Sequence, residues 1–459
     1  MSAENASTPG EAGGTEPQAA GDSSGSDPNA SRGPGPENAF GGPADEESGA
    51  RGLLKGAGIV AVALGLVQVS AYLLSVAGAR LLPPSEFGAL ASLLNLVAIG
   101  SVVAFGLQAV AARLIVQSDP ASRSAIGARL LRFSWLVGAV LALAVIAVSP
   151  VITGLLDQSG LMVTALVGLA LLPITLAGGL YGIAQGREQH LRLGLLLVVT
   201  GLARFLGGVL GLLVFGTVFG TIAVMTLGAL IGALVAVFMV RPITDAAPLK
   251  VDRLTSQVLH ASHAMFALFV ATSIDLLLAR YFLPGPESGV YAVGAVVAKV
   301  AFWLPQFVAV IAFPRMADDR RERTTVVAAA AVAAIGLVIV IGLVLLPNLV
   351  ISFVGGSQYA SLAGSLWIFG VIGAAFALAQ FLLYSRLAVD DRRAVYALWV
   401  AVIAIVAGVS LWHGSVAQVA SVVAAVALLL AGVGVAALLI DRRRGAEHPI
   451  EGFESLERG

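Results

Sequence analysis

The sequence predicts an all-α integral membrane protein with about twelve transmembrane helices in two six-helix lobes, related by a parallel internal duplication. Three observations predict this class: the composition, a series of apolar runs of membrane-spanning length, and a sequence repeat at an offset near 200 residues. Of the 459 residues, 58% are hydrophobic and 12% are charged, and the mean hydropathy is +0.93. A water-soluble surface needs more charge than this. The composition therefore excludes a soluble globular protein.

The ends of the chain differ in composition from its middle. Ser, Gly, Pro, Ala and Glu dominate residues 1–50, and such a segment cannot bury an apolar core, so we expect a disordered cytoplasmic tail. No basic start with an apolar core precedes Gly56, so we expect no secretory signal and a first apolar run that stays in the membrane. The predicted organisation is then an N-terminal lobe over 51–250, a C-terminal lobe over 251–445 and a second cytoplasmic tail over 446–459.

Continuous apolar runs follow one another from Gly56 to Ile440, each near the roughly 20 residues that a helix needs to cross the hydrocarbon core. Because they are continuous and do not alternate with polar residues, they exclude a β-barrel. The approximate predicted spans are 56–80, 87–112, 133–155, 160–184, 192–214, 217–240, 257–281, 289–313, 324–346, 362–385, 394–412 and 416–440.

Connecting segments that are rich in Lys and Arg alternate along the chain with segments that contain few of these residues. By the positive-inside rule the rich segments are cytoplasmic, which predicts a multi-pass protein of the plasma membrane with both termini in the cytoplasm. The rich set comprises Arg51 and Lys55; Arg113, Arg123, Arg129 and Arg132; Arg187 and Arg192; Arg241, Lys250 and Arg253; Arg315, Arg320, Arg321 and Arg323; Arg386, Arg392 and Arg393; and Arg442 to Arg444.

An internal repeat joins the two halves. The segment ARLLPPSEFGALA, from Ala79 to Ala91, matches ARYFLPGPESGVYA, from Ala279 to Ala292, so that Arg80 corresponds to Arg280. A second match at offset 203 aligns LYGIAQGREQHLR with LYSRLAVDDRRAV about a hundred residues further along. Two lobes that both enter from the cytoplasm are related by an axis along the membrane normal.

These segments resemble Wzx-type polysaccharide exporters, which belong to the multidrug/oligosaccharidyl-lipid/polysaccharide exporter superfamily. The resemblance lies in the R-x-L-x-P-x-E-x-G pattern, in its echo from Asp275 to Ala292, and in the GIAQGREQ loop. It also includes FPRMAD, from Phe313 to Asp318, and the stretch from Gly355 to Tyr359.

The resemblance implies a V-shaped pair of lobes that flips a lipid-linked glycan precursor, of the undecaprenyl-pyrophosphate type, from the inner to the outer leaflet by alternating access. The implied partners are this glycan substrate, the lipid bilayer, and glycosyltransferases or a polymerase. The alternative that stays open is a multidrug/cation antiporter of the same superfamily, which would need an intramembrane carboxylate for coupling.

Other functional classes have little support in the sequence. The 27 basic residues equal the 27 acidic ones, so no basic excess indicates a nucleic-acid partner. With no cysteine and five scattered histidines, we expect no metal site and no cofactor. The short outer loops offer few carboxylates or histidines, so we expect no enzyme.

Ionisable side chains inside predicted spans are expensive and therefore point to function or to pairing. Lys299 and Arg204 are candidates for binding an anionic cargo, because a phosphate in a low-dielectric region needs compensating charge. The alternatives are interhelical pairing of Lys299 with Asp275, and plain close packing around Arg204. Asp275 is a candidate either for ion coupling or for an ion pair with Lys299 or Arg280.

The lead span of each half carries further cavity candidates. Gln68, Tyr72 and Ser75 share one helical face, and Thr272 and Asp275 occupy the places that match the last two. This predicts a shared polar cavity, although hydrogen bonds between helices would explain Tyr72 and Thr272 equally well.

Two further groups of residues lie near the ends of the spans. Arg80 and Arg280 form either a pseudo-symmetric pair at an outer gate or two side chains that snorkel to lipid headgroups. Asn95 and Gln108 in the second span complete the polar inventory, and Pro305 predicts a kink in the eighth span.

Overall fold

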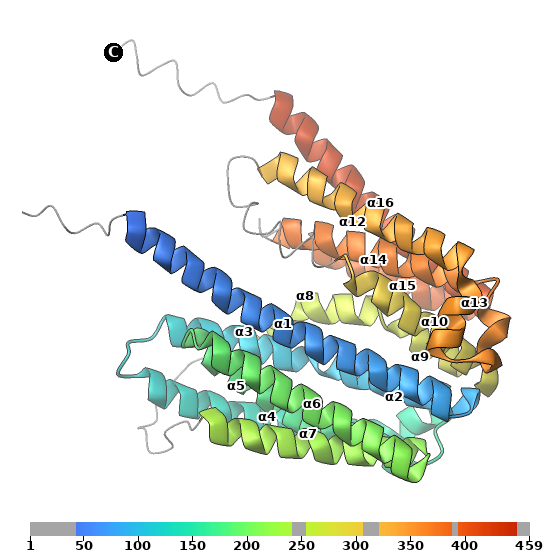
Figure 1. The fold of residues 1–459 in the computed structure, drawn as a ribbon, viewed down its shortest axis with the longest axis horizontal. Coiled ribbons are helices and arrows are strands. Elements are labelled where there is room, and N and C mark those ends of the chain that lie inside the picture. The colour runs from blue at the N-terminus through green and yellow to red at the C-terminus, as the bar shows by residue number, and fades with distance from the viewer. Residues whose placement is uncertain (1–42, 241–253, 306–320, 388–392, 448–459) are drawn as a thin grey trace, which may run out of the picture. The chain divides into compact units, whose positions relative to one another are not determined.

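The computed structural model describes residues 43–240, 254–305, 321–387 and 393–447, and every element in these ranges is helical (Figure 1). Contacts divide the chain into residues 1–54 and residues 55–459. Among the described residues, ten helices are long and apolar enough to cross a membrane, and Val395–Leu411 is a shorter apolar helix. The helix Gly285–Trp303 occupies the place of the eighth predicted span. The prediction of an all-α membrane protein with about twelve spans is therefore confirmed.

Residues 43–240 form the helices of the first half. They are α1 (Pro43–Leu81), α2 (Pro84–Gly100), α3 (Val102–Val116), α4 (Arg123–Leu155), α5 (Leu161–Gly186), α6 (His190–Phe215) and α7 (Val218–Val240).

The second half follows from residue 254 onward. Its described elements are α8 (Leu254–Ala271), α9 (Ile274–Phe282), α10 (Gly285–Trp303), α12 (Arg321–Leu345), α13 (Pro347–Val354), the 3-10 helix η2 (Ser357–Leu362), α14 (Leu366–Leu387), α15 (Arg393–Leu411) and α16 (Val416–Glu447).

Two predicted boundaries differ from the structure. The predicted tail over 1–50 overlaps α1, which begins at Pro43. A proline suits the first helical position, and the acidic residues that follow it suit a helix N-terminus, so this part of the tail is helical. The C-terminal tail was placed from residue 446, whereas α16 extends to Glu447.

Three predicted spans are interrupted or shortened. The second span breaks at Ser101 into α2 and α3, and the seventh breaks at Thr272 and Ser273 into α8 and α9. In the eighth span α10 ends at Trp303, and Pro305 lies in the turn that follows, as its inability to continue the hydrogen-bond ladder requires. The rest of that span, with Gln306 and the FPRMAD segment, lies outside the described residues.

Large apolar side chains cover the exposed faces of the helices. Leu143 is 66% exposed, Phe238 63%, Leu345 71% and Leu429 69%. A soluble protein rarely exposes apolar surface of this extent, whereas lipid tails are its natural solvent. These faces are consistent with a multi-pass membrane protein.

The succession of helices defines two ends of the bundle. The distal end holds the turns at 82–83, 156–160 and 283–284 and the segment 346–365, which contains α13 and η2. The proximal end holds the turns at 117–122 and 187–189. These names are used below in that sense only.

The repeat seen in the sequence reappears in the start of α2 and of α10. Pro83 precedes α2 with φ −56° and ψ 151°, and Pro284 precedes α10 with φ −53° and ψ 152°. Both helices then carry a proline in their first turn. Since a proline has a fixed φ and lacks the N–H that a helix start leaves unused, the same residues set both helices off in the same way.

Helices α2 and α10 meet where glycine is required. A Cβ on Gly289 would lie 1.8 Å from the carbonyl oxygen of Pro84, and one on Gly88 would lie 2.6 Å from Ser288 Oγ. Gly88 and Gly289 are themselves matching positions of the repeat. The two halves thus touch through equivalent surfaces, as two-fold related subunits do.

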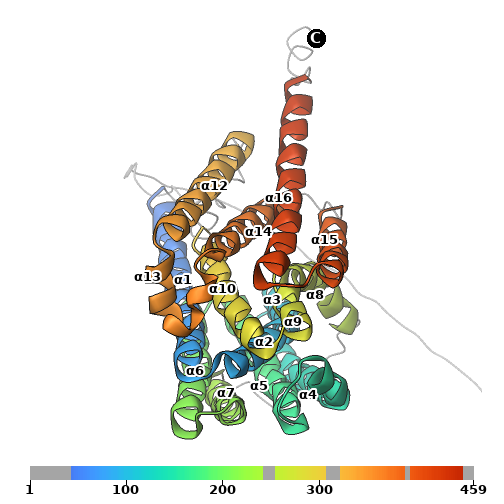
Figure 2. The ribbon, with the colours of Figure 1, turned by 90° about the vertical axis from the view of Figure 1, so that its right-hand side faces the viewer.

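Helices α2 and α10, which join the halves, lie between the other helices of the two halves (Figure 2). Besides α2 with α10, α3 packs against α8, where a Cβ on Gly106 would collide with Ser262 Oγ. α2 also packs against α9 and α8, whereas other close packings, such as α6 with α7 and α14 with α16, stay within one half. The division into lobes at about residue 250 falls in 241–253, outside the described residues, and stays a prediction.

Candidate functional site

A chain of hydrogen bonds connects the two halves at Lys299. The ammonium Nζ of Lys299, on α10, donates to Oδ1 of Asn95, on α2, over 2.6 Å. The amide Nδ2 of Asn95 donates in turn to the carbonyl oxygen of Ser273 over 2.5 Å. Asn95 is 1% exposed, so its buried amide needs hydrogen-bond partners within the protein. A buried neutral amide therefore fixes the position of the lysine.

The break between α8 and α9 supplies the acceptor for Asn95. Ser273 has φ −138° and ψ −17°, outside the helical region, and it serves as the N-cap residue of α9. The Asn95 amide donates to the Ser273 carbonyl, so a side chain of α2 contacts the break between α8 and α9 directly.

Tyr72 adds α1 to this cluster. Its hydroxyl donates to the backbone carbonyl of Lys299 over 3.2 Å, across 227 positions of the chain. Tyr72 is half-buried, and its helical face therefore turns toward the second half at this point. Gln68, one turn earlier on that face, is also half-buried. Thr272 bonds within its own helix, to the carbonyls of Leu268 and Phe269, and contributes no described bond to the cluster.

Asp275 is buried and has a different partner from those that the sequence suggested. Its Oδ2 accepts a hydrogen bond from the Tyr291 hydroxyl over 2.8 Å, and only 6% of Asp275 is exposed. The described residues form no direct ion pair between Asp275 and Lys299, which interact only electrostatically. Tyr291 precedes Lys299 by eight positions on α10, or about 12 Å of helix. A direct Lys299–Asp275 pair is therefore wrong for this structure.

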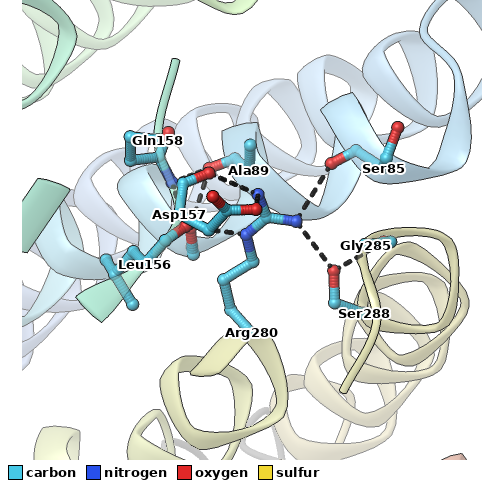
Figure 3. Close-up of polar contacts among 9 residues, drawn as sticks. Ser85, Ala89, Leu156, Asp157, Gln158, Arg280, Gly285 and Ser288 are labelled. Atoms are coloured by element: carbon cyan, nitrogen blue, oxygen red, sulfur yellow. Dashed lines mark hydrogen bonds and ion pairs between the residues drawn. The ribbon is translucent and has the colours of Figure 1, made fainter. Parts of the chain in front are cut away.

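The expected pair of Asp275 with Arg280 is also wrong. Five positions along α9 turn the side chain by about 140°, so the two point to different sides. Arg280 is 7% exposed and reaches away from Asp275 into the first half, to the turn after α4 (Figure 3). This burial also excludes headgroup snorkelling for Arg280. Arg80, in contrast, is exposed and donates to carbonyls of the second half.

Arg204 lies apart from the Lys299 cluster, on α6 within the first half. Its charge interacts with Tyr181 of α5, whose hydroxyl is hydrogen-bonded to the Thr200 hydroxyl. Arg204 shares no described hydrogen bond with Lys299, Asn95 or Tyr72. The structure therefore separates the two cations that the sequence grouped together.

The cluster also contains residues that sequence reasoning left without a role. Asn95 was noted only as a polar residue, and Ser273 and Tyr291 were not singled out. Asn95 could have been found because it stands alone in the apolar run LLNLVAIG, where an amide needs a partner. Tyr291 has no such signal, because tyrosine is common in membrane helices.

Comparisons with known proteins identify a family and a fold. A family of "Polysaccharide biosynthesis protein" sequences matches residues 78–363, which include Asn95, Asp275 and Lys299. No curated protein matches the chain.

Several solved structures are similar in fold. An inward-facing multidrug resistance MATE family transporter of the MOP superfamily is 14% identical, with a TM-score of 0.64, covering 82% of this chain and 94% of that one. The lipid II flippase MurJ, in an inward closed conformation, is 12% identical, with a TM-score of 0.66, covering 84% and 87%. A MOP superfamily transporter from Pyrococcus furiosus is 13% identical, with a TM-score of 0.55, covering 85% and 95%. With most of its length described by one family and one fold, the chain belongs to the polysaccharide biosynthesis protein family and has the fold of the MOP superfamily transporters.

Proposed function

We propose that the protein flips a lipid-linked glycan precursor from the inner to the outer leaflet of the plasma membrane by alternating access between its two halves. Both termini lie in the cytoplasm in this proposal, so the distal end faces outward. The Lys and Arg distribution supports that orientation, because basic segments are retained on the cytoplasmic side. The cargo is an undecaprenyl-pyrophosphate-linked glycan, supplied by glycosyltransferases and passed on to a polymerase.

The observation that carries the proposal is the way in which Lys299 is held. Its ammonium group donates to a neutral amide oxygen, not to a carboxylate, and the residue is partly exposed. An ammonium group has three donors, and the bond to Asn95 uses one of them. The remaining donors and the charge suit a phosphate oxygen, which binds cations strongly where water is scarce.

The contacts of Lys299 also support a role in transport, because they join the two halves. Asn95 and Tyr72 belong to the first half and Lys299 to the second, so the cluster lies on the boundary that alternating access must rearrange. A phosphate bound there interacts with both halves. Its binding can therefore favour one arrangement of the halves over another, provided that its affinity differs between the two.

The experiment that tests the proposal measures translocation of a polyprenyl-pyrophosphate-linked glycan in proteoliposomes, with an impermeant glycosidase that digests only glycan on the outer face. Lys299→Gln removes the charge and should abolish translocation, while Lys299→Arg should retain part of it. The matched control is Arg204→Gln, which removes an intramembrane cation outside the cluster. Translocation that is equal in Lys299→Gln and the unmodified protein, at equal protein level, would remove the cargo role of Lys299.

A cation-coupled drug antiporter is the second candidate, and Asp275 is the residue that favours it. Coupling needs a carboxylate whose charge changes with the state of the carrier. In this structure Asp275 is buried and its carboxylate accepts a hydrogen bond from Tyr291. Efflux of a cationic dye that Asp275→Asn abolishes, together with no translocation of the glycan lipid, would favour the antiporter.

A further inference from the structure

The distal end of the bundle carries two cross-half contacts made by matching arginines. Arg280, on α9, donates from Nε to Leu156 O over 2.8 Å and from Nη2 to Asp157 O over 2.7 Å. Arg80, on α1, donates from Nη2 to Ser352 O over 2.8 Å and to Phe353 O over 2.6 Å. Each arginine thus belongs to one half and binds backbone of the other.

The acceptors lie at a helix C-terminus or directly after it. Ser352 and Phe353 belong to the last turn of α13, whereas Leu156 and Asp157 are the first two residues after α4. Both helices are followed by a tight turn. The last carbonyls of a helix have no intrahelical partner and carry the negative end of the helix dipole. A guanidinium group offers several donors in a planar fork, which suits two adjacent carbonyls. Each half therefore supplies the cap that completes a helix of the other.

The turns after these two helices are also equivalent. Asp157 has a positive φ of 43°, and Gly356, 199 positions later, has a φ of 85°. In both turns a residue with positive φ changes the direction of the chain just beyond the helix, although Gly356, with ψ −175°, lies outside the left-handed helical region. For Asp157, a residue with a side chain, this conformation costs free energy that surrounding contacts must offset. The Arg280 bond to the Asp157 carbonyl is one such contact.

The two caps differ in their surroundings. Arg280 is buried, and it also donates to Ser85 O and Ser288 Oγ and approaches the Asp157 carboxylate at 3.6 Å (Figure 3). Arg80 is exposed, and its described acceptors are the two carbonyls alone. If its cap breaks, water can replace the carbonyls at Arg80, whereas Arg280 would leave several buried partners unpaired.

We propose that reciprocal capping of α13 by Arg80 and of α4 by Arg280 holds the distal end closed, and that the Arg80 cap is the one that releases when this end opens. The inference rests on the alternating access of the proposed function and deepens it, because it names the contact between the halves that opens; it does not depend on the identity of the cargo. Gly88 and Gly289, where α2 meets α10, also lie at the distal end. The two arginine contacts therefore add to this contact between the halves.

A cysteine pair measures this closure directly, because the chain has no cysteine of its own. A Cβ on Gly285 would lie 3.2 Å from the Cβ of Ser85, in the opposite half. This is near the separation of about 3.5–4.5 Å that a disulfide requires. Ser85→Cys with Gly285→Cys should therefore cross-link in the full chain in membranes when the distal end is closed. A short oxidant pulse followed by a maleimide gives the ratio of closed to open protein.

Arg80→Gln should lower that ratio about tenfold, which corresponds to about 1.4 kcal/mol, because glutamine cannot supply the charged donors that bind the two carbonyls. Arg80→Lys should have a smaller effect, because an ammonium group lacks the planar fork. The matched control is Arg113→Gln, which removes an arginine that donates across the halves at the proximal end, to Gln257 over 2.9 Å. This control should leave the ratio unchanged or raise it.

The outcomes separate the parts of the proposal. An unchanged ratio in Arg80→Gln, at normal protein level, overturns the role of the Arg80 cap, whether or not Arg280→Gln accumulates in membranes. If Arg280→Gln lowers the ratio and Arg80→Gln does not, the assignment of release to Arg80 is wrong. Because no cargo is present, either failure leaves the proposed transport function untouched, and a failure of transport by Lys299→Gln leaves this assay untouched.

Discussion

Lys299 Nζ lies 2.6 Å from the Oδ1 atom of Asn95, a residue 204 positions earlier in the chain and in the opposite half. An amide oxygen at this distance stabilises the ammonium group by a charge-assisted hydrogen bond but leaves its net charge in place. The same amide binds Ser273 O through its nitrogen, so both ends of the Asn95 side chain are occupied. Asn95 is therefore a positioning residue for Lys299.

Asn95→Asp should reduce translocation of the glycan lipid by about tenfold or more at equal protein level, and it also removes the donor to the Ser273 carbonyl. The new carboxylate would pair with Lys299 and compete with a phosphate for it, and an interaction change of about 1.4 kcal/mol already corresponds to a factor of ten. The proteoliposome assay with the impermeant glycosidase measures this. Gln108→Glu is the matched control, because Gln108 lies in the same span but bonds to Gln185 within the first half. An equal loss of translocation in Asn95→Asp and Gln108→Glu would mean that any negative charge in this span reduces translocation, whatever its position.

Gly289→Ala should destabilise the protein by about 1–3 kcal/mol, the usual cost of overpacking. The added methyl group would lie 1.8 Å from the Pro84 carbonyl oxygen, which is backbone and cannot move without shifting α2. Thermal unfolding in detergent measures the loss. Gly65→Ala is the control: it is also a helical glycine but has open space around it, so it should be neutral or slightly stabilising. A Gly289→Ala protein as stable as the control would contradict the contact.

Tyr291→Phe should destabilise the protein by about 1–3 kcal/mol, because it leaves the buried Asp275 carboxylate without its hydroxyl donor. Tyr359→Phe is a matched control, since the Tyr359 hydroxyl is buried and has no hydrogen-bond partner in the described residues. Removing that hydroxyl should be neutral or stabilising. The comparison of the two unfolding temperatures gives the result, and equal temperatures would show that the Tyr291–Asp275 bond adds nothing to stability.

The orientation is open to cysteine labelling from outside intact cells. Ser357 is exposed at the distal end and Ala121 is exposed at the proximal end. An impermeant maleimide should label Ser357→Cys and should leave Ala121→Cys unlabelled until the membrane is permeabilised. The reverse pattern would place the termini outside the cell and overturn the proposed direction of transport.

Sequence reasoning located the spans because the thickness of the bilayer sets their length, whatever their neighbours are. It did not locate the breaks at Ser101 and at Thr272–Ser273. Ser101 lies in an otherwise apolar run, and the polar residues Thr272 and Ser273 can also occur within a continuous span. The second break contacts the Asn95 amide of another helix. Interruptions that depend on a distant partner leave little trace in the local sequence.

For the candidate site too, the sequence identified some residues but not the partners that they contact. Lys299 and Asp275 stood out because charge inside a span is rare. Their partners did not, because the rotation of α10 and the step between Tyr291 and Lys299 decide which group each can reach. The matching of Arg80 with Arg280 was visible in the repeat, but their acceptors are backbone carbonyls, and every residue has one of those.

The contact between Gly88 and Gly289 has a consequence for how such a chain could arise. A surface that meets its own equivalent is what a two-fold homodimer uses, so two copies of a half-length ancestor could have assembled through this patch before they were fused. Fusion frees the copies to diverge. The repeat places apolar Ala98 or Ile99 opposite Lys299, so a charge that every symmetric dimer would have carried twice is present once. A cargo bound to Lys299 would therefore lie away from the pseudo-two-fold axis and would contact the second half more than the first.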